Sequence, residues 1–265
     1  MGINTIYLLI YVLRHLKNMK KHSLLFLILI IIPKLIMAQD YLTTDILSRV
    51  FHMKYKTQTG TTFLVAKDSV NYFVTAKHVL QNPKYGEKLT VEIYQDSLWK
   101  TLTGNVYFDK TNDVDVALIM PEGFGFVQSG ISLKNIQTII GDEGYFLGFP
   151  YGLSSLDKGK INAGFPFPLV KKAVFSGTTT NNDVQTIFLD GHNNPGFSGG
   201  PVLFKDRMKN GDNKFHLVGI VSAYLNQQND LITPFGKLKY KENSGIIIAI
   251  GKEQIDTIIE NIKTP

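Results

Sequence analysis

The chain has 265 residues, of which 44% are hydrophobic and 19% are charged. This length accommodates one or two domains, and the composition excludes an intrinsically disordered protein. The absence of cysteine excludes disulfides, thiolate metal sites and a cysteine nucleophile. The formal net charge is +6, but five of the 28 basic residues lie in the first 38 positions. The remaining 23 basic residues balance 22 acidic ones, which leaves no basic excess for binding nucleic acid.

The N-terminus carries the pattern of a secretory signal peptide. Two lysines precede an unbroken apolar run at residues 24–32, and Ala38 offers a small residue at a cleavage point. We therefore predict a leader over residues 1–38, with the signal peptide at about residues 19–38, and export to the periplasm or the medium. The alternative is an uncleaved segment that anchors the protein in the membrane. In both cases the leader is the only part expected to meet a membrane.

The rest of the sequence, residues 39–265, consists mainly of short strand-like segments separated by turn residues. Leu89, Val91 and Ile93 alternate with polar residues, which is the pattern of a strand with one buried face. Strand-like segments are found at residues 61–66, 71–75, 89–94, 114–120, 145–147, 185–189, 201–204, 216–221 and 246–250. Many short strands at this spacing favour an all-β barrel or sandwich.

The last segment has a different period. Isoleucines at positions 255, 258, 259 and 262 follow the i, i+3, i+4, i+7 spacing of one helix face, with polar residues between them. This pattern predicts an amphipathic helix over residues 252–262 that packs on the preceding strand.

A glycine-rich turn at residues 195–201 (PGFSGGP) contains Ser198. A nucleophilic serine needs an exposed hydroxyl and backbone N–H groups aimed at the oxyanion that forms on attack. Glycine lets the backbone turn tightly and approach a substrate without a Cβ in the way. The backbone N–H groups of Gly196 and Ser198 are therefore the candidate oxyanion donors.

A serine hydroxyl needs a base to act as a nucleophile at neutral pH. Four histidines follow the leader, and His78 is preferred because it ends the strand-like segment 73–78 (FVTAKH). Asp115 enters an apolar run (DVALI), where an unpaired carboxylate would be costly, so we expect it to pair with His78. Such an acid orients the imidazole and stabilises its charged form. Asp113, two residues earlier, is the alternative for this third position.

Three segments, residues 75–79 (TAKHV), 115–118 (DVAL) and 196–201 (GFSGGP), resemble the active-site signatures of trypsin-like serine proteases. They occur in the order His, Asp, Ser. The segment 190–201 is most similar to its counterpart in the bacterial HtrA/Deg-type branch, although no PDZ module is expected after the protease part. The similarity extends over about residues 55–262.

The resemblance implies two six-stranded antiparallel β-barrels, at about residues 45–130 and 135–250, followed by the helix. In this family the serine attacks the scissile carbonyl, the histidine transfers its proton to the leaving amine, and the aspartate fixes the histidine tautomer. His78 and Asp115 would come from the first barrel and Ser198 from the second. The resemblance thus implies an exported serine endopeptidase that acts on peptides or proteins through an acyl-enzyme, without a cofactor.

Position 197 departs from the family pattern, because Phe197 stands where aspartate or asparagine is usual. Activation by an N-terminal amine that pairs with that aspartate is therefore not expected. His192 lies six residues before the serine, where the family has the base of its substrate pocket. Val221, Ser222 and Ala223 would form one wall of this pocket and pair with the substrate backbone.

Other functions stay open. The segment 196–200 also matches the G-x-S-x-G elbow of α/β-hydrolases, but Pro201 opposes the helix that must follow such an elbow. A second alternative is an inactive pseudoprotease or peptide-binding module, if Phe197 distorts the oxyanion turn. A metal enzyme has no support, since the sequence contains neither a His-Glu-x-x-His motif nor a cysteine cluster.

Overall fold

The computed structural model describes residues 42–110, 114–123, 130–155, 162–206, 214–234 and 236–263. The predicted leader and its signal peptide lie outside these residues. No helix in the described segments is long and apolar enough to cross a bilayer.

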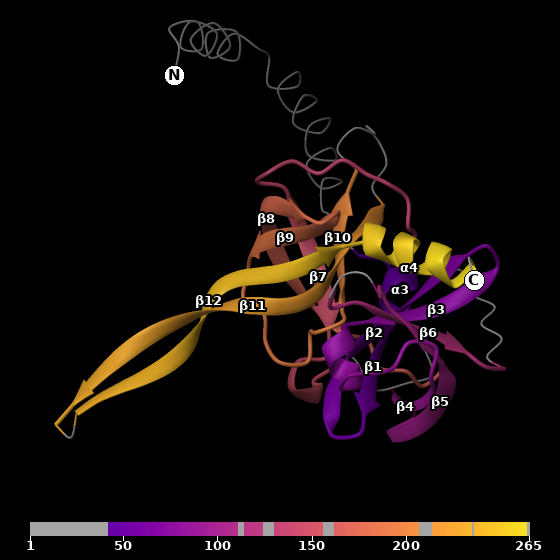
Figure 1. The fold of residues 1–265 in the computed structure, drawn as a ribbon, viewed down its shortest axis with the longest axis horizontal. Helices are drawn as coiled ribbons and strands as arrows, with labels where there is room; N and C mark the ends of the chain where they lie inside the picture. Colours follow the sequence, from indigo (N-terminus) through magenta and orange to yellow (C-terminus); the bar gives the residue numbers. More distant parts are fainter. Residues whose placement is uncertain are drawn as a thin grey trace, which may run out of the picture. The chain divides into compact units, whose positions relative to one another are not determined.

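The strands of the described chain form two closed barrels of six strands each (Figure 1). The first barrel has the strand order β1-β2-β3-β6-β5-β4, and neighbouring strands are antiparallel. Its strands are β1 (Val50–Tyr55), β2 (Gln58–Lys67), β3 (Val70–Thr75), β4 (Lys88–Gln95), β5 (Leu98–Tyr107) and β6 (Ala117–Pro121). In β4, Leu89, Val91 and Ile93 are buried and alternate with more exposed residues, as predicted.

The second barrel has the order β10-β11-β12-β9-β8-β7, and its neighbouring strands are also antiparallel. Its strands are β7 (Glu143–Gly148), β8 (Leu169–Asn181), β9 (Val184–Asp190), β10 (Pro201–Lys205), β11 (Phe215–Thr233) and β12 (Gly236–Gly251). A short helix α3 (Thr44–Leu47) precedes the first barrel, and α4 (Glu253–Lys263) follows the second. The predicted pair of six-stranded barrels with a C-terminal helix is confirmed.

Several hairpins turn on two residues with positive φ. Asp68–Ser69, Asp96–Ser97 and Asn182–Asp183 each have both φ angles positive. This is the geometry that a two-residue type I′ hairpin requires, and it matches the right-handed twist of the strands. Aspartate and asparagine tolerate this region better than most side chains, so these turns fix the hairpin registers without glycine.

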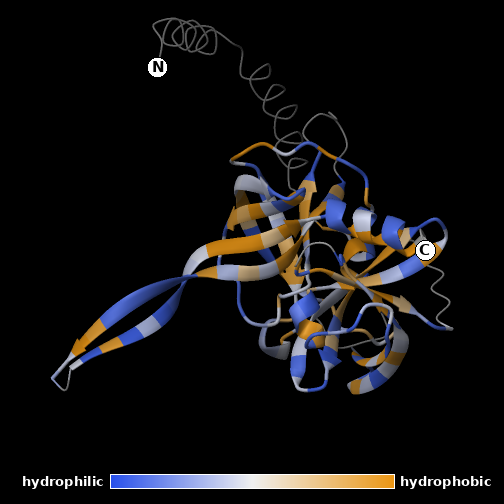
Figure 2. Cartoon of the chain, viewed as in Figure 1, coloured by the Kyte–Doolittle hydropathy of each residue, from blue (hydrophilic) through white to orange (hydrophobic). Residues whose placement is uncertain are grey.

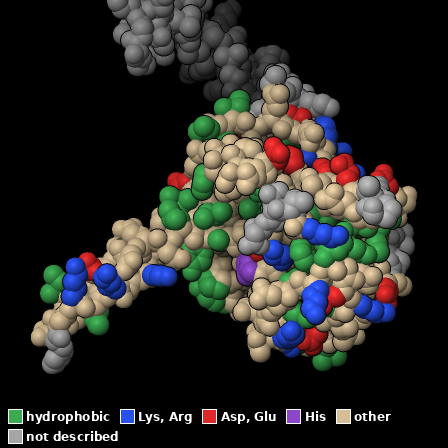
Figure 3. All heavy atoms as spheres, in the orientation of Figure 1, with side chains coloured by type: hydrophobic (Ala, Val, Ile, Leu, Met, Phe, Trp, Pro, Cys, Tyr) green, Lys and Arg blue, Asp and Glu red, His purple; other side chains and the backbone are tan. Residues whose placement is uncertain are grey.

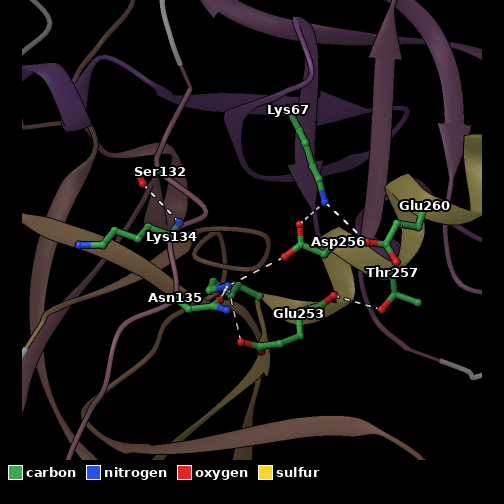
Figure 4. A network of polar contacts seen from close by, with 9 residues as sticks. Lys67, Ser132, Lys134, Asn135, Glu253, Asp256, Thr257 and Glu260 are labelled. Carbon is green, nitrogen blue, oxygen red and sulfur yellow. Dashed lines mark hydrogen bonds and ion pairs between the residues drawn. The ribbon is translucent and has the colours of Figure 1, made fainter.

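Helix α4 packs on the barrels through the predicted apolar face. Ile255, Ile258 and Ile259 are fully buried in a cluster that also holds residues of both barrels. Lys67 of β2 lies 2.6 Å from Asp256 and 3.9 Å from Glu260 (Figure 4). These ion pairs are partly exposed and contribute at most about 1 kcal/mol, so the buried isoleucines provide most of the attachment.

Candidate active site

Strand pairing brings His78 and Asp115 together. β3 pairs with β6 in a register that places Thr75 opposite Ala117, so the residues just beyond each strand end are neighbours. His78 lies in a short 3₁₀ turn after β3, and Asp115 lies two residues before β6. Nδ1 of His78 is 2.8 Å from Oδ2 of Asp115, and the backbone N–H of His78 donates to Oδ1 at 2.9 Å. In the neutral tautomer whose Nδ1–H donates to the carboxylate, Nε2 of the half-exposed ring is the acceptor nitrogen.

A third donor reaches the same carboxylate from the second barrel. The hydroxyl of Ser222, on β11, donates to Oδ2 of Asp115 at 2.5 Å. Burial raises the pKa of the Asp115 carboxyl, but the hydrogen bonds and charge of His78 and the hydrogen bond from Ser222 outweigh this effect. The net pKa of Asp115 lies below its ordinary value, so the group is a carboxylate at neutral pH.

Ser198 lies at the centre of a turn that is linked to this pair through Ser222. Gly196 and Gly199 have φ angles of +106° and +84°, which a residue with a Cβ rarely adopts. The hydroxyl of Ser198 donates to the carbonyl of Ser222 at 3.4 Å, and among the described residues no hydrogen bond joins it to His78. The backbone N–H groups of Gly196 and Ser198 have no acceptor in the described part of the chain. N–H groups without a partner, such as these two on either side of Phe197, are available to bind an anionic oxygen.

Thr61 of β2 attaches this turn to the first barrel. Its hydroxyl donates to the carbonyl of Gly196 at 2.7 Å and accepts from the backbone N–H of Phe149 at 3.1 Å. Its backbone N–H donates to the carbonyl of Ser198 at 2.9 Å. With the carbonyls of Gly196 and Ser198 held this way, both peptide units of the turn are fixed across the barrel junction. Sequence reasoning did not identify Thr61.

Phe197 anchors the turn on its other side. Its side chain is fully buried in the second barrel, where its ring packs edge-on against Phe146 at a centroid distance of 4.8 Å. A Cβ on Gly148 would lie 2.7 Å from Phe197 and 2.7 Å from the Thr61 hydroxyl, so only glycine fits there. The residue that departs from the family pattern is therefore an apolar anchor of the turn.

Comparison with known families agrees with this architecture. The family model of the trypsin-like peptidase domain matches residues 60–208, more than half of the chain. The chain belongs to the trypsin-like peptidase family. No curated protein sequence matches it.

Solved structures of several proteases share the fold at low identity. A serine endoprotease from Yersinia pestis is 18% identical with a TM-score of 0.52, over 82% of this chain and 64% of that one. Rv3671c from M. tuberculosis H37Rv, in an inactive form, is 15% identical with a TM-score of 0.53, over 86% and 94%. The HtrA-type protease AlgW with a tripeptide is 17% identical with a TM-score of 0.50, over 83% and 61%. This peptidase chain thus spans less than two thirds of the Yersinia protein and of AlgW.

The residues predicted to line the substrate pocket of this trypsin-like peptidase lie beside the Ser198 turn. Val221 has a buried side chain, and its backbone accepts from Gly199 at 2.7 Å and donates to Gly200 at 2.9 Å. Ala223 is exposed. Its carbonyl accepts from the side-chain amide of Asn193 at 3.3 Å. Val221 therefore contributes its backbone at this site, while its side chain belongs to the core.

His192 is exposed, and the ammonium group of Lys171 donates to its carbonyl. The same ammonium group donates to Oδ1 of Asn194 at 3.3 Å, and burial lowers the pKa of Lys171. Lys171 therefore braces the loop that leads into the serine turn, a role that sequence reasoning missed.

The other histidines that follow the leader do not contribute to this site. His52 and His216 are buried in the two barrels, and neither contacts Asp115. The alternative acid, Asp113, lies outside the described residues. The described segments contain no group of three or more side chains able to hold a metal ion.

Proposed function

We propose that this trypsin-like peptidase is a serine endopeptidase in which His78, Asp115 and Ser198 form the catalytic triad. The observation that carries the proposal is the pair of hydrogen bonds, at 2.8 and 2.9 Å, that fixes His78 on Asp115. This orientation directs the basic Nε2 of His78 away from the carboxylate, as a general base for a serine requires. Gly196 and Ser198 would supply the oxyanion N–H groups.

The reaction we propose runs in two halves. Nε2 of His78 takes the proton of Ser198 as Oγ attacks the scissile carbonyl, and the oxyanion binds the N–H groups of Gly196 and Ser198. His78 then gives the proton to the leaving amine, which leaves an acyl-enzyme. In the second half, His78 takes a proton from water as the water attacks the ester carbonyl of the acyl-enzyme. The carboxylic acid product is released, and the proton returns to Ser198. Asp115 stays ionised throughout and stabilises the imidazolium.

The first step requires Ser198 to exchange one hydrogen-bond partner. Its hydroxyl now donates weakly to the carbonyl of Ser222 at 3.4 Å. Rotation about χ1 turns Oγ toward His78, and such catalytic hydrogen bonds are commonly long before substrate binds. The substrates would be peptides or proteins, whose backbone pairs with residues 221–223 and whose side chain enters a pocket beside His192. The leader pattern supports action outside the cytoplasm.

In the test, a protein comprising residues 39–265 and its Ser198→Ala variant are each incubated with a diverse peptide mixture. The products are identified by mass spectrometry. Cleavage by the parent alone, together with fluorophosphonate labelling of Ser198 that His78→Ala abolishes, is the expected result. Asp115→Asn should lower kcat by about 10⁴-fold while the fold is kept. Cleavage by neither protein would favour a peptide-binding module, and cleavage by both would point to a contaminating protease.

A further inference from the structure

β11 and β12 continue beyond the second barrel as a long two-stranded hairpin (Figure 1). We call residues 226–243 the arm. Its strands pair without interruption from Asn226 opposite Asn243 to Thr233 opposite Gly236. Nearly all of its described side chains are exposed, so no other element of the described chain covers it. An isolated two-stranded ribbon is marginally stable in water, which indicates that the arm has a partner.

The arm is apolar at its end and polar along its stem (Figure 2). Leu231 and Leu238 are opposite each other near the turn, with exposed fractions of 51% and 59%. Ile232 is the next residue, on the other face of the ribbon, and is 85% exposed. The stem that follows carries amide side chains at Asn226, Gln227, Gln228, Asn229 and Asn243, and one carboxylate, Glu242, which accepts from the amide of Asn229 at 2.8 Å.

This distribution distinguishes between kinds of partner. A ribbon that docks on a protein or on a second copy of the chain buries one face, so its apolar residues should share that face. Here Ile232 lies on one face, opposite Lys237, and the Leu231–Leu238 pair lies on the other, so each face of the end carries a large apolar side chain. A medium that surrounds the tip on every side fits better, and a lipid bilayer is such a medium. The apolar end extends over about three residues, or ~10 Å, close to the depth that interfacial elements reach.

The residues next to the apolar end have the chemistry of a membrane interface. Lys237, Lys239 and Lys241 alternate along β12, and Tyr240 lies between the last two, 47% exposed (Figure 3). Lys237 pairs with Asp230 at 2.7 Å. Lys239 and Lys241 have no ion-pair partner within the described segments. Lysines at this level attract anionic headgroups, and tyrosine favours the boundary between headgroups and hydrocarbon.

The turn can enter an apolar medium without exposing all its polar groups. The hydroxyl of Thr233 donates to the carbonyl of Gly236 at 2.8 Å, across the turn. The strand register pairs the two backbones up to the same residues. Internal hydrogen bonding of this kind is what lipid requires of a backbone that leaves water.

We propose that the arm inserts its tip, which carries Leu231, Ile232 and Leu238, into the surface of an anionic lipid bilayer. β11 runs without a break from Ser222, beside the serine turn, to the tip. Insertion would therefore hold the serine turn on the membrane side of the molecule, where exported or membrane-attached polypeptides are met. This binding is independent of the proposed peptidase chemistry, and Ser198→Ala should bind vesicles as the parent does.

The test is sedimentation of residues 39–265 with vesicles. Every strand of both barrels lies within this part of the chain, and the predicted leader is absent from it. The vesicles are phosphatidylcholine alone, and phosphatidylcholine mixed with an equal part of phosphatidylglycerol. The parent should sediment with the anionic vesicles, less with the neutral ones, and less again as salt is raised.

Matched variants identify the surface. Ile232→Glu and Leu238→Glu should each weaken partitioning about tenfold or more, because each loses the burial of a large apolar side chain. Lys239→Gln with Lys241→Gln should weaken binding to anionic vesicles only. Leu98→Glu, at the first residue of β5, and Ile140→Glu, in the segment before β7, change side chains that are 64% and 71% exposed and should bind as the parent does.

Three results would overturn the proposal. The parent could fail to sediment with either vesicle, or Ile232→Glu could bind as well as the parent. The third is a concentration-dependent mass in analytical ultracentrifugation that Ile232→Glu abolishes, with no vesicle binding, which would assign the tip to a second copy of the chain.

Discussion

Ser222 Oγ lies 2.5 Å from Asp115 Oδ2, so a residue of the second barrel donates a hydrogen bond to a carboxylate of the first. The carbonyl of the same Ser222 accepts the hydroxyl of Ser198 at 3.4 Å. One residue thus touches two members of the proposed triad, and its position depends on how the barrels meet.

Removal of this hydroxyl should slow catalysis more than it affects folding. Ser222→Ala takes one donor from Asp115, and we expect kcat on a soluble peptide to fall about tenfold, since hydrogen bonds to charged groups are the stronger ones. Ser222→Thr should restore most of the activity because it keeps the hydroxyl. Ser244→Ala is the control, because the Ser244 hydroxyl donates to the carbonyl of Leu225 at the base of the arm, and it should leave kcat unchanged. Equal losses in Ser222→Ala and Ser222→Thr would mean that packing, not the hydrogen bond, is responsible.

The side chain of Thr61 should act on the serine turn through its hydroxyl. Thr61→Val keeps the shape and the backbone contact to Ser198, but it leaves the carbonyl of Gly196 and the N–H of Phe149 without their partner. We expect kcat/KM and the rate of fluorophosphonate labelling to fall about a hundredfold, the loss typical of a disturbed oxyanion site. Stability should fall by about 1–3 kcal/mol. Thr61→Ser keeps the hydroxyl and is the matched control. A labelling rate in Thr61→Val equal to that of the parent would show that the hydrogen bonds of this hydroxyl are not needed to hold the oxyanion turn.

His52 gives the fold a pH dependence of its own. Its ring stacks on Phe149 at a centroid distance of 5.1 Å and meets Trp99 edge-on at 4.8 Å. Burial lowers the pKa of His52 from 6.5 to about 4. The unfolded chain therefore binds more protons here than the folded chain between these two pH values. The contribution of neutral His52 to the free energy of unfolding is complete above pH 6.5. It is lost progressively as pH falls toward about 4, by about 3 kcal/mol in total.

A neutral ring of similar size should remove this dependence. We expect His52→Phe to keep the aromatic packing and to lose less free energy of unfolding than the parent between pH 7 and pH 4.5, measured by urea denaturation. His192→Gln changes an exposed histidine and should follow the parent. If the curves of His52→Phe and the parent stay parallel, the acid sensitivity arises elsewhere.

Sequence patterns predicted those features of the fold and the site that depend on residues close together in the chain. The three motifs around His78, Asp115 and Ser198 are each a few residues long, and the isoleucine spacing of α4 lies within one helix. β1, β5 and β8 were not predicted. β5 and β8 bury only a few of their residues, and two of these, Gly104 and Ala173, are too small to give a strong hydropathy signal. Thr61 and the contact from Ser222 were missed for another reason. These side chains bond to partners 135 and 107 positions away, and no local pattern encodes such a pairing.

The arm was missed because it has no core. Residues 226–243 are rich in amides and lysines, and their few apolar side chains are exposed, so the period of a half-buried strand is absent. Cross-strand hydrogen bonding alone continues β11 and β12 beyond the barrel, and hydropathy cannot report it.

Phe197 should couple stability to the chemistry of Ser198, because its ring fills the second core while its backbone forms the serine turn. Phe197→Ala opens a cavity beside Phe146 and should cost about 3–5 kcal/mol. Among molecules that remain folded, we also expect much slower fluorophosphonate labelling, since the turn loses its anchor. Phe175→Ala is the matched control, because Phe175 belongs to the same cluster but packs against Phe204, away from the turn. Phe175→Ala should lose a similar free energy of unfolding. Its Ser198 should nevertheless react with the fluorophosphonate at the parental rate, at a temperature where both variants are folded. Parental labelling of Phe197→Ala would show that Thr61 and the glycines hold the turn without this ring.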